Sequence, residues 1–323
     1  MEAASGDASR SRKRYRSHNK KSDGPAKQAS RSSERSVGRS RSSSSVDRSE
    51  SQSAKETFYF ALQCKEIENP DTLWWHSPEN YISLATEASM IDVLVKWKKT
   101  ERGMMKSQPG FRVNQIRKLC KSTGVPISQA ASLRRHHMKR LNPTLAMSRL
   151  QLGDEEDIRE SARLFEVAVD RFLRSQNVPF WTEEEHKDHI TKHRKDGDPF
   201  PPTPDFILKK QVRVKKCKDM NVKRVVEERS ICWVEAKMFY GASTIAHDGR
   251  SAVGCLMKTA KKYVRVYGQG AMVFMQGCGD KLAAELAEVG VIALDCSGNT
   301  VSLGIVEDHQ RTWCGDKNGN ILP

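Results

Sequence analysis

The sequence lacks long apolar runs and closely spaced cysteine pairs. No apolar stretch approaches the ~18 residues that a membrane-spanning helix needs, so we expect no membrane partner. The eight cysteines are scattered and form no Cys-x-x-Cys pair, and the polar N-terminus has no recognisable secretory leader. We therefore expect reduced thiols in a nuclear or cytosolic protein rather than a disulfide-bonded secreted one.

Acidic residues are too few to balance the basic ones. The 323 residues include 55 Lys and Arg against 40 Asp and Glu, which gives a formal net charge of +15. A surplus of this size predicts a polyanionic partner, most simply a nucleic acid, DNA or RNA.

Residues 1–55 contain almost no aromatic side chains. Ser, Arg and Lys dominate, and 14 Lys and Arg stand against 6 Asp and Glu, so about half of the net charge lies here. Such a segment buries too little apolar surface to offset its ordering entropy, and we expect a disordered basic tail. Its run RSRKRYR, from Arg10 to Arg16, is typical of a nuclear import signal and equally of a solvated tail.

Residues 56–150 show helical rather than strand periodicity. Ile116 and Leu119 repeat at helical spacing, Gly124 breaks the helix, and a second apolar stripe follows it. This order is typical of a helix-turn-helix unit. The second helix carries a basic row that suits phosphate contact, including Arg134, Arg135, Lys139 and Arg140. An ordinary helical hairpin with a solvated basic face is the alternative.

Residues 151–323 mix helical and strand patterns. The apolar periodicity predicts helices at 157–175, 250–266 and 279–290. Alternating or apolar segments predict strands at 205–214, 230–239, 271–276 and 291–296. A basic, mobile insertion is expected at 215–224. This order predicts an α/β or α+β domain whose sheet is covered by helices.

Two charged residues interrupt the apolar strand expected at 230–239. Glu235 and Lys237 are two positions apart, so both project from one face, whereas Ala236 points to the other. Asp205 follows a Pro-rich turn and comes beside Glu235 if the two strands form a hairpin. Adjacent carboxylates repel each other and raise each other's pKa, and a divalent cation removes that penalty.

This arrangement predicts a site for Mg²⁺ or Mn²⁺. Asp205 and Glu235 supply the hard oxygen ligands, and substrate phosphate and water complete the shell. Lys237 then orients the attacking water or neutralises charge on the scissile phosphate. The alternative is a surface hairpin with a cross-strand ion pair.

The pattern Pro-Asp…Glu-x-Lys is that of the PD-(D/E)xK nuclease superfamily, and its spacing alone also arises by chance. Glu185-His186-Lys187 fits the same pattern. That copy lies in a polar segment of helical character, without an apolar strand around it. Only the copy at Glu235 and Lys237 has the strand context that the chemistry requires.

The residues around the motif are more specific. The segments TPDFIL (from Thr203), WVEAK (from Trp233) and EVAVDRFLRSQNVPF (from Glu166) resemble the TPD-motif family of that superfamily. The resemblance implies a restriction-endonuclease-like core behind a helical N-terminal region. It also implies metal-dependent phosphodiester hydrolysis by an endonuclease, and a codanin-like protein partner.

The same resemblance assigns roles to individual residues. It makes Asp205, Glu235 and Lys237 the catalytic residues and Glu166 a further metal ligand, although Glu166 also suits the boundary of an amphipathic helix. It further implies a nucleic-acid contact from Tyr263, on the helix expected at 250–266. Four residues earlier this sequence has Thr259 where related nucleases have Gln, and we expect Lys258 and Lys262 to make phosphate contacts instead.

Three histidines raise an alternative metal site. His186, His189 and His193 have spacings seen in zinc sites, but zinc takes about four ligands, and no cysteine or acid at a suitable spacing completes the set.

The sequence thus predicts a nuclear, Mg²⁺-dependent nuclease, with the cytoplasm as a second location. It has a tail at 1–55, a helical region at 56–150 and a PD-(D/E)xK domain at 151–323. The competing hypothesis is a nucleic-acid- or protein-binding module with little or no turnover. A desolvated Asp-Glu-Lys cluster argues against that module, because a purely structural domain has no use for one. An SR-type RNA-processing factor is a third hypothesis, which rests on the tail alone.

Overall fold

We describe the protein from a computed structural model. The residues that the structure describes are 64–78, 81–94, 97–99, 105–107, 113–125, 129–130, 132–134, 137, 155–193, 200–245 and 252–314. All of them belong to one compact unit, residues 48–323. The tail expected at 1–55 lies outside the described residues.

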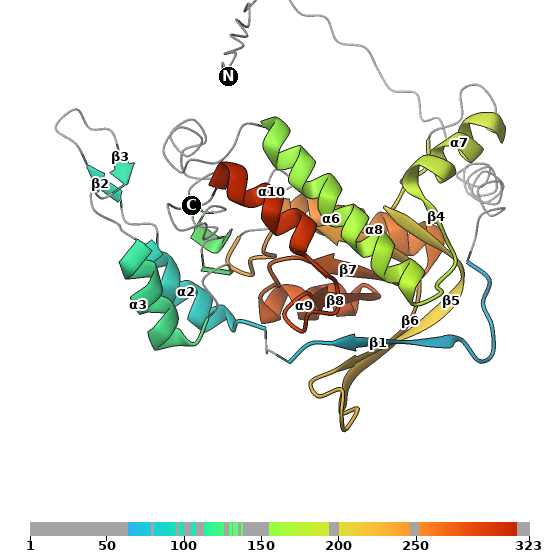
Figure 1. Cartoon of the computed structure of the whole chain (residues 1–323), viewed down its shortest axis with the longest axis horizontal. Helices are drawn as coiled ribbons and strands as arrows, with labels where there is room; N and C mark the ends of the chain where they lie inside the picture. The colour runs from blue at the N-terminus through green and yellow to red at the C-terminus, as the bar shows by residue number, and fades with distance from the viewer. Residues whose placement is uncertain are drawn as a thin grey trace, which may run out of the picture. The chain divides into compact units, whose positions relative to one another are not determined.

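A mixed β-sheet forms the centre of this unit (Figure 1). Its strands are β1 (Asp71–His76), β4 (Phe180–Thr182), β5 (Phe206–Cys217), β6 (Val225–Lys237), β7 (Gly270–Phe274) and β8 (Val291–Asp295). Their order is β1-β5-β6-β7-β8, and β4 pairs with the start of β5. The β5–β6 and β4–β5 pairs are antiparallel, whereas β1–β5, β6–β7 and β7–β8 are parallel. A separate ribbon joins β2 (Trp97–Lys99) and β3 (Met105–Ser107).

Helices cover both faces of the sheet. They are α2 (Leu84–Leu94), α3 (Val113–Thr123), α6 (Glu155–Ser175), α7 (Glu183–His193), α8 (Ala252–Tyr267), α9 (Asp280–Glu288) and α10 (Gly304–Cys314). α6 and α10 cross one face side by side (Figure 1), joined by Ser161, whose hydroxyl lies 2.9 Å from His309 Nδ1. Residues of α2, α3, α8 and α9 pack on the opposite face. The mixed α/β class expected from the sequence is confirmed.

Strand alternation divides the core into two clusters. On β7, Met272 and Phe274 join the cluster under α8 and α9, whereas Ala271 and Val273 join the cluster under α6. Every residue of β7 and β8 is buried, as expected for parallel strands covered on both faces. The expected strands near 271–276 and 291–296 are therefore confirmed, each slightly shortened.

Helix α6 ends by a local signal that the sequence carries. After the buried Leu173, Asn177 adopts a left-handed backbone with φ of 54°. The N–H of Val178 then donates to the carbonyl of Leu173 at 3.0 Å. This bond satisfies a carbonyl that the last turn leaves free. It directs the chain into β4 and towards β5.

Strand β1 corrects the expectation that residues 56–150 are helical. Leu73 and Trp75 are buried while Trp74 and His76 are partly exposed, which is the alternation of a strand with one covered face. Trp75 also donates from Nε1 to the carbonyl of Asp295 at 2.7 Å. The N-terminal region therefore contributes an edge strand to the central sheet.

The basic insertion expected at 215–224 is shorter than predicted. β5 continues to Cys217, so only 218–224 forms the turn between β5 and β6. Lys216 is 5% exposed, and its ammonium contacts the hydroxyl of Tyr81 and the carbonyl of Ala293. Burial lowers the pKa of Lys216, against the pull of nearby acids such as Asp295. Its partners lie far away in the sequence, so no local pattern marked this lysine as buried.

Only part of the expected helix-turn-helix unit lies within the described residues. α3 covers the first helix, and Gly124, with φ of 72°, follows its end. Residues 132–134 are helical, and the hydroxyl of Ser132 accepts the N–H of Tyr240 at 3.0 Å. This unit therefore packs against the chain segment that follows β6. Among the described helices, none is both long and apolar enough to cross a membrane.

Candidate functional site

The β5–β6 hairpin brings Asp205 and Glu235 together. Phe206 pairs with Val234 in the antiparallel register, so the two carboxylates face each other one position further along. The N–H of Asp205 donates to Glu235 Oε2 at 3.1 Å, and the N–H of Ala236 donates to Asp205 Oδ2 at 2.7 Å. Each carboxylate is thus held by the backbone of the other strand, and no described residue is hydrogen-bonded to Asp205 Oδ1. The hairpin expected from the sequence is confirmed.

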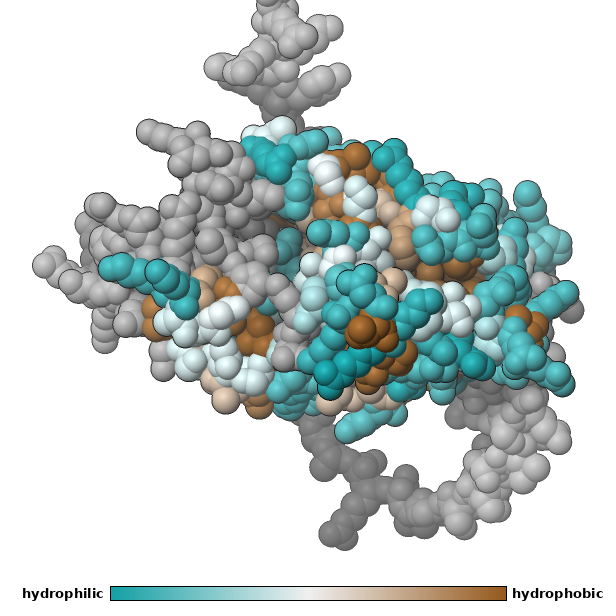
Figure 2. All heavy atoms as spheres, turned by 60° about the horizontal axis from the view of Figure 1, so that its bottom comes forward, coloured by the Kyte–Doolittle hydropathy of each residue, from teal (hydrophilic) through white to brown (hydrophobic). Residues whose placement is uncertain are grey.

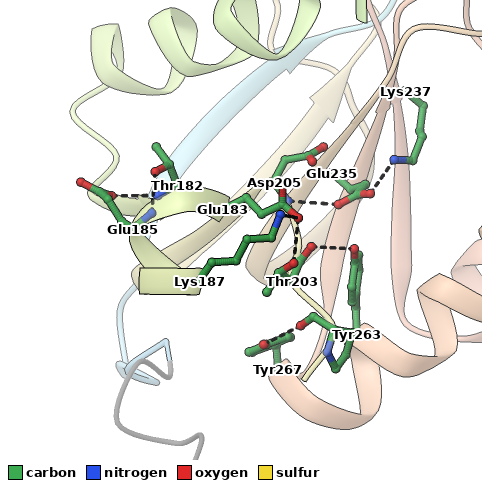
Figure 3. A network of polar contacts seen from close by, with 11 residues as sticks. Thr182, Glu183, Glu185, Lys187, Thr203, Asp205, Glu235, Lys237, Tyr263 and Tyr267 are labelled. Atoms are coloured by element: carbon green, nitrogen blue, oxygen red, sulfur yellow. Dashed lines mark hydrogen bonds and ion pairs between the residues drawn. The ribbon is translucent and has the colours of Figure 1, made fainter. Parts of the chain in front are cut away.

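Lys237 completes a compact set of charges at the end of β6. Its Nζ lies 2.5 Å from Glu235 Oε1 (Figure 3). Ala236 is buried in the core on the opposite face, so alternation places the two charged side chains together, as expected. Glu235 is only 5% exposed, which makes this an enclosed ion pair rather than a surface one.

Close packing around Trp233 restricts the position of β6 next to Glu235. Gly270 pairs with Trp233, two residues before Glu235. A Cβ on Gly270 would lie 2.0 Å from the indole of Trp233. The tryptophan also donates from Nε1 to the carbonyl of Gly268 at 2.8 Å. A large, fixed side chain therefore sets the position of the strand that carries Glu235.

The electrostatics of the site oppose two ionised carboxylates. Burial, with the negative charge of Glu235 next, raises the pKa of Asp205 to about 8, although Lys237 counteracts the shift. Burial alone would lower the pKa of Lys237, but Glu235, Asp205 and Glu166 outweigh it, so the net pKa is raised. Lys237 therefore stays cationic, while Asp205 readily holds a proton when no other cation is near.

Glu166 approaches the site from helix α6. Burial raises the pKa of its carboxyl, Lys237 lowers it, and Glu183 and Glu235 raise it again. These interactions place a third carboxylate within electrostatic reach of the pair. The sequence predicted this residue as a metal ligand; it lies on α6, which packs on the sheet face that buries Ala236.

Two tyrosines of α8 hold the turn that leads into β5. We call this turn, Thr203–Asp205, the TPD turn. The hydroxyl of Tyr263 donates to the carbonyl of Thr203 at 2.9 Å, and that of Tyr267 donates to the carbonyl of Pro202 at 2.7 Å (Figure 3). Tyr263 is 6% exposed, so its ring braces the turn from within. The four-residue spacing of these tyrosines was the only sequence signal for this function.

Helix α7 supports the same turn and explains the second Glu-x-Lys pattern. The N–H of Thr182 donates to Glu185 Oε2 at 2.9 Å, and the N–H of Glu185 faces Thr182 Oγ1 at 3.3 Å. This reciprocal pair is a capping box at the start of a helix. The neighbouring Glu183 accepts the hydroxyl of Thr203 at 2.7 Å and pairs with Lys187 at 2.7 Å. Glu185 and Lys187 therefore have structural partners, as their helical context predicted.

A buried glutamate that sequence reasoning missed organises the chain after β6. Glu87 of α2 is fully buried and accepts the hydroxyl of Tyr240 at 2.6 Å. It also accepts the N–H of Ser243 at 3.1 Å and both the N–H and the hydroxyl of Thr244 at 3.0 Å. Burial raises the pKa of Glu87, and these donors lower it in part. The apolar neighbours of Glu87 in α2 were the only signal in the sequence.

Comparison with known families identifies the region that holds this geometry. Residues 148–297 match the TPD sequence-motif family. That family is described as a protein of unknown function. The match spans the TPD turn, Glu166 and the strand with Glu235 and Lys237. No curated protein and no solved structure matches the chain.

The TPD turn and β6 provide the oxygen donors that could hold a metal. Across the described residues, no group of three or more His, Cys, Asp and Glu side chains is gathered closely enough to hold an ion. Mg²⁺ does not need such a cage, because it keeps several waters and takes one or two carboxylates plus substrate phosphate. Asp205 and Glu235 fit that requirement, and the raised pKa of Asp205 marks a place where a cation relieves repulsion.

The three histidines do not form a zinc site. His186 is buried beside Tyr267, with ring centroids 5.8 Å apart, and neither of its nitrogens has a partner within the described part of the chain. Burial and the nearby His189 lower its pKa to about 4. His189 stacks on His193 at 4.2 Å. The three rings therefore do not converge, and the alternative of zinc is unsupported.

The nucleic-acid contacts expected from the sequence fall into two groups. Lys258 and Lys262 are exposed on α8, the helix that braces the TPD turn. Arg134 is 7% exposed, and its Nε donates to the carbonyl of Leu94 at 3.1 Å. Arg134 therefore lies inside the helical region, not on an open basic face. The remaining candidates, Arg135, Lys139 and Arg140, lie outside the described residues.

Proposed function

We propose that the protein is a metal-dependent nuclease that hydrolyses phosphodiester bonds of DNA or RNA, with a restriction-endonuclease-like core. The observation that carries this proposal is the enclosed set of Asp205, Glu235 and Lys237 at the ends of two paired strands. Enclosing like charges costs folding free energy, so a ligand that repays the cost is expected. Glu166 adds a carboxylate that interacts electrostatically with Lys237 and Glu235.

The chain's own residues divide the reaction between them. Asp205, through Oδ1, and Glu235 would hold Mg²⁺ or Mn²⁺, with Glu166 as a further acid near them. When bound, such an ion supplies charge stabilisation of the phosphoryl group and lowers the pKa of water. Lys237 remains protonated next to three carboxylates. Its Nζ is therefore suited to stabilise negative charge on the scissile phosphate rather than to accept a proton.

Rigid support explains why the site stays in place before substrate arrives. Tyr263 and Tyr267 hold the turn that carries Asp205, and Trp233 fixes the strand that carries Glu235. Catalytic groups on strands with locked neighbours lose little entropy when the substrate binds. This support favours an enzyme over a loosely built binding surface.

A cleavage assay tests the proposal. Purified full-length protein is incubated with Mg²⁺ or Mn²⁺ and a panel of single-stranded, duplex and branched DNA and RNA, beside Asp205→Ala and Lys237→Ala. We expect cleavage of at least one substrate by the wild type, and its loss in both variants and with a chelator. Lys192→Gln, on the exposed end of α7, is the control that keeps activity.

The closed Glu235–Lys237 ion pair also suits a non-catalytic module. Tight nucleic-acid binding without cleavage of any substrate, in the presence of either ion, would support that second function. Cleavage that persists in both variants would remove this site from the reaction altogether.

A further inference from the structure

The turn between β5 and β6 exposes an unusual amount of apolar surface. The described residues include six exposed large hydrophobic side chains, and four of them lie at 220–226. They are Met220, Val222, Val225 and Val226. The turn, at the bottom of Figure 1, faces the viewer in Figure 2, where apolar surface is ringed by hydrophilic atoms. A cluster of this kind on a soluble surface marks an interaction site.

An aromatic ring flanked by lysines lies next to this turn. Trp74 of β1 pairs in register with Lys215 of β5. The Nζ of Lys215 is 5.7 Å from the centroid of the indole, and the Nζ of Lys223 is 4.9 Å from it. Trp74 remains partly exposed, unlike Trp75 beside it. Both ammonium groups lie over the indole ring, and cations close to an aromatic ring are typical elements of a nucleic-acid stacking site.

The charge around the turn is positive. Its cations are Arg213, Lys215, Lys218, Lys223 and Arg224, and its acids are Asp219, Glu227 and Glu228. Glu228 is shared between Arg213 at 3.4 Å and Lys215 at 3.5 Å. Lys223 and Arg224 are exposed. This surplus favours a polyanionic ligand over a second copy of a chain that itself carries a net charge of +15.

Strand β5 connects this surface to the candidate site. It begins directly after Asp205 and ends at Cys217, twelve residues later. At ~3.3 Å per residue the strand spans at most ~40 Å, the length of about twelve nucleotides. One nucleic acid can therefore reach both ends of the hairpin.

We propose that this surface, the hairpin tip (Trp74, Met220, Val222, Lys223, Val225 and Val226), binds unpaired nucleotides. Apolar side chains and an indole face gain nothing from a sugar-phosphate backbone, and a duplex hides its base faces. Unpaired bases offer flat apolar faces for stacking, and their phosphates match the surrounding cations. The substrate class is then single-stranded nucleic acid or a duplex with a single-stranded end. That the same molecule is cut at Asp205 rests on the proposed function.

A binding assay without divalent ions tests the hairpin tip. Fluorescence anisotropy compares a single-stranded oligothymidylate and a duplex, each about 20 nucleotides long, which exceeds the ~40 Å length of the hairpin. The variant Val222→Ser/Lys223→Gln alters only exposed side chains and should fold. We expect it to weaken single-strand binding at least roughly tenfold and duplex binding less than about twofold. Lys281→Gln, which removes an exposed cation from α9, is the matched control and should change neither.

Tryptophan fluorescence gives a second, local measurement. Binding of the single strand should quench the emission of the wild type, and Trp74→Phe should remove part of this quenching while keeping an aromatic ring at the position. Equal weakening of single-strand and duplex binding, or unchanged binding by the double variant, would overturn the proposal. So would a dimer, measured by light scattering, that the double variant abolishes, because the tip would then dock a second copy.

The two proposals fail separately. Single-strand discrimination that depends on the tip, in a protein that cuts nothing, would leave the hairpin tip valid and refute the nuclease. Cleavage that depends on Asp205, with no effect of Val222→Ser/Lys223→Gln on binding, would do the reverse.

Discussion

The two ends of the β5–β6 hairpin depart in opposite ways from the usual rule that charged side chains are exposed and apolar side chains are buried. At the base, Glu235 is a charged residue that is only 5% exposed, whereas at the turn Val222 is an apolar residue that is 70% exposed. Folding alone favours neither, because charge is stabilised in water and valine in a core. Both exceptions lie on the same hairpin, which is therefore the element whose side chains folding stability alone explains least.

The largest expected effect is the loss of cleavage when the negative charge of Glu235 is removed. Glu235→Gln keeps the shape of the side chain but removes one of the two carboxylates of the proposed metal site. We expect cleavage to fall roughly 10³-fold, measured as the initial rate on the best substrate of the panel. Single-strand binding should not weaken, because a negative charge has been removed. Weakened binding together with retained cleavage would contradict the assignment of cleavage to the Glu235 end of the hairpin and of binding to the hairpin tip.

The next effect concerns the packing of β6 beside Glu235, measured as the free energy of unfolding. Gly270→Ala places a methyl group 2.0 Å from the indole of Trp233, and we expect a loss of about 3 kcal/mol in the free energy of unfolding. Urea unfolding followed by circular dichroism measures it. Gly304→Ala is the control, since no described atom lies within 4 Å of the new methyl group, and it should change the free energy by less than ~0.5 kcal/mol. Similar losses in both variants would contradict the packing described for β6.

A smaller effect depends on pH. The pKa of Asp205 is raised to about 8 in the folded protein, against ~3.9 in an unfolded chain. The folded state therefore holds a proton that the unfolded chain has released, and stability falls as pH rises from about 4 to about 8. Asp205→Asn removes this slope, and without divalent ions it should be more stable than the wild type at pH 8 by ~1–3 kcal/mol.

Urea unfolding at pH 5 and pH 8 measures this slope, and Asp188→Asn, at an exposed position on α7, is the control. If Asp205→Asn is no more stable than the wild type at pH 8, the carboxylates of Asp205 and Glu235 do not repel each other. Added Mg²⁺ should stabilise the wild type more than Asp205→Asn, because the proposed metal site requires both carboxylates.

The smallest expected effect is at the tip. Val222→Ser changes a side chain that packs on little else, so the free energy of unfolding should change by less than ~0.5 kcal/mol. Thermal unfolding checks this value, with Val273→Ser, in the buried strand β7, as the contrasting variant that should lose several kcal/mol. A loss at Val222 comparable to that at Val273 would show that the tip is part of the core.

Local sequence patterns were sufficient for the elements that build the site. Glu235 and Lys237 stood out because alternation is strict in a strand. The approach of Asp205 to Glu235 was expected on the condition that the two apolar segments form a hairpin. Helix α6 carried clear apolar periodicity, and strands β7 and β8 were recognisable as short, continuous apolar runs. Each of these features depends on residues within a few positions of each other.

Long-range features could not be obtained in this way. Lys216 is buried because Tyr81 and Ala293 meet it from other parts of the chain, and its basic neighbours gave the opposite impression. Tyr263 was expected to contact nucleic acid, yet its hydroxyl reaches the carbonyl of Thr203 sixty positions earlier. Glu87 acquires its partners from a segment more than 150 positions away. Such contacts depend on tertiary packing, which a single sequence does not encode in any local pattern.

The position of β1 sets a practical limit on how this protein can be shortened. The region that matches the family begins at residue 148, but the partner of β5 along Val212–Cys217 is Asp71–His76. A fragment starting at 148 would present six residues of bare strand edge, and unpaired edges of this kind recruit other chains and aggregate. A fragment with a fully paired sheet therefore has to begin before Asp71, or receive β1 as a separate peptide.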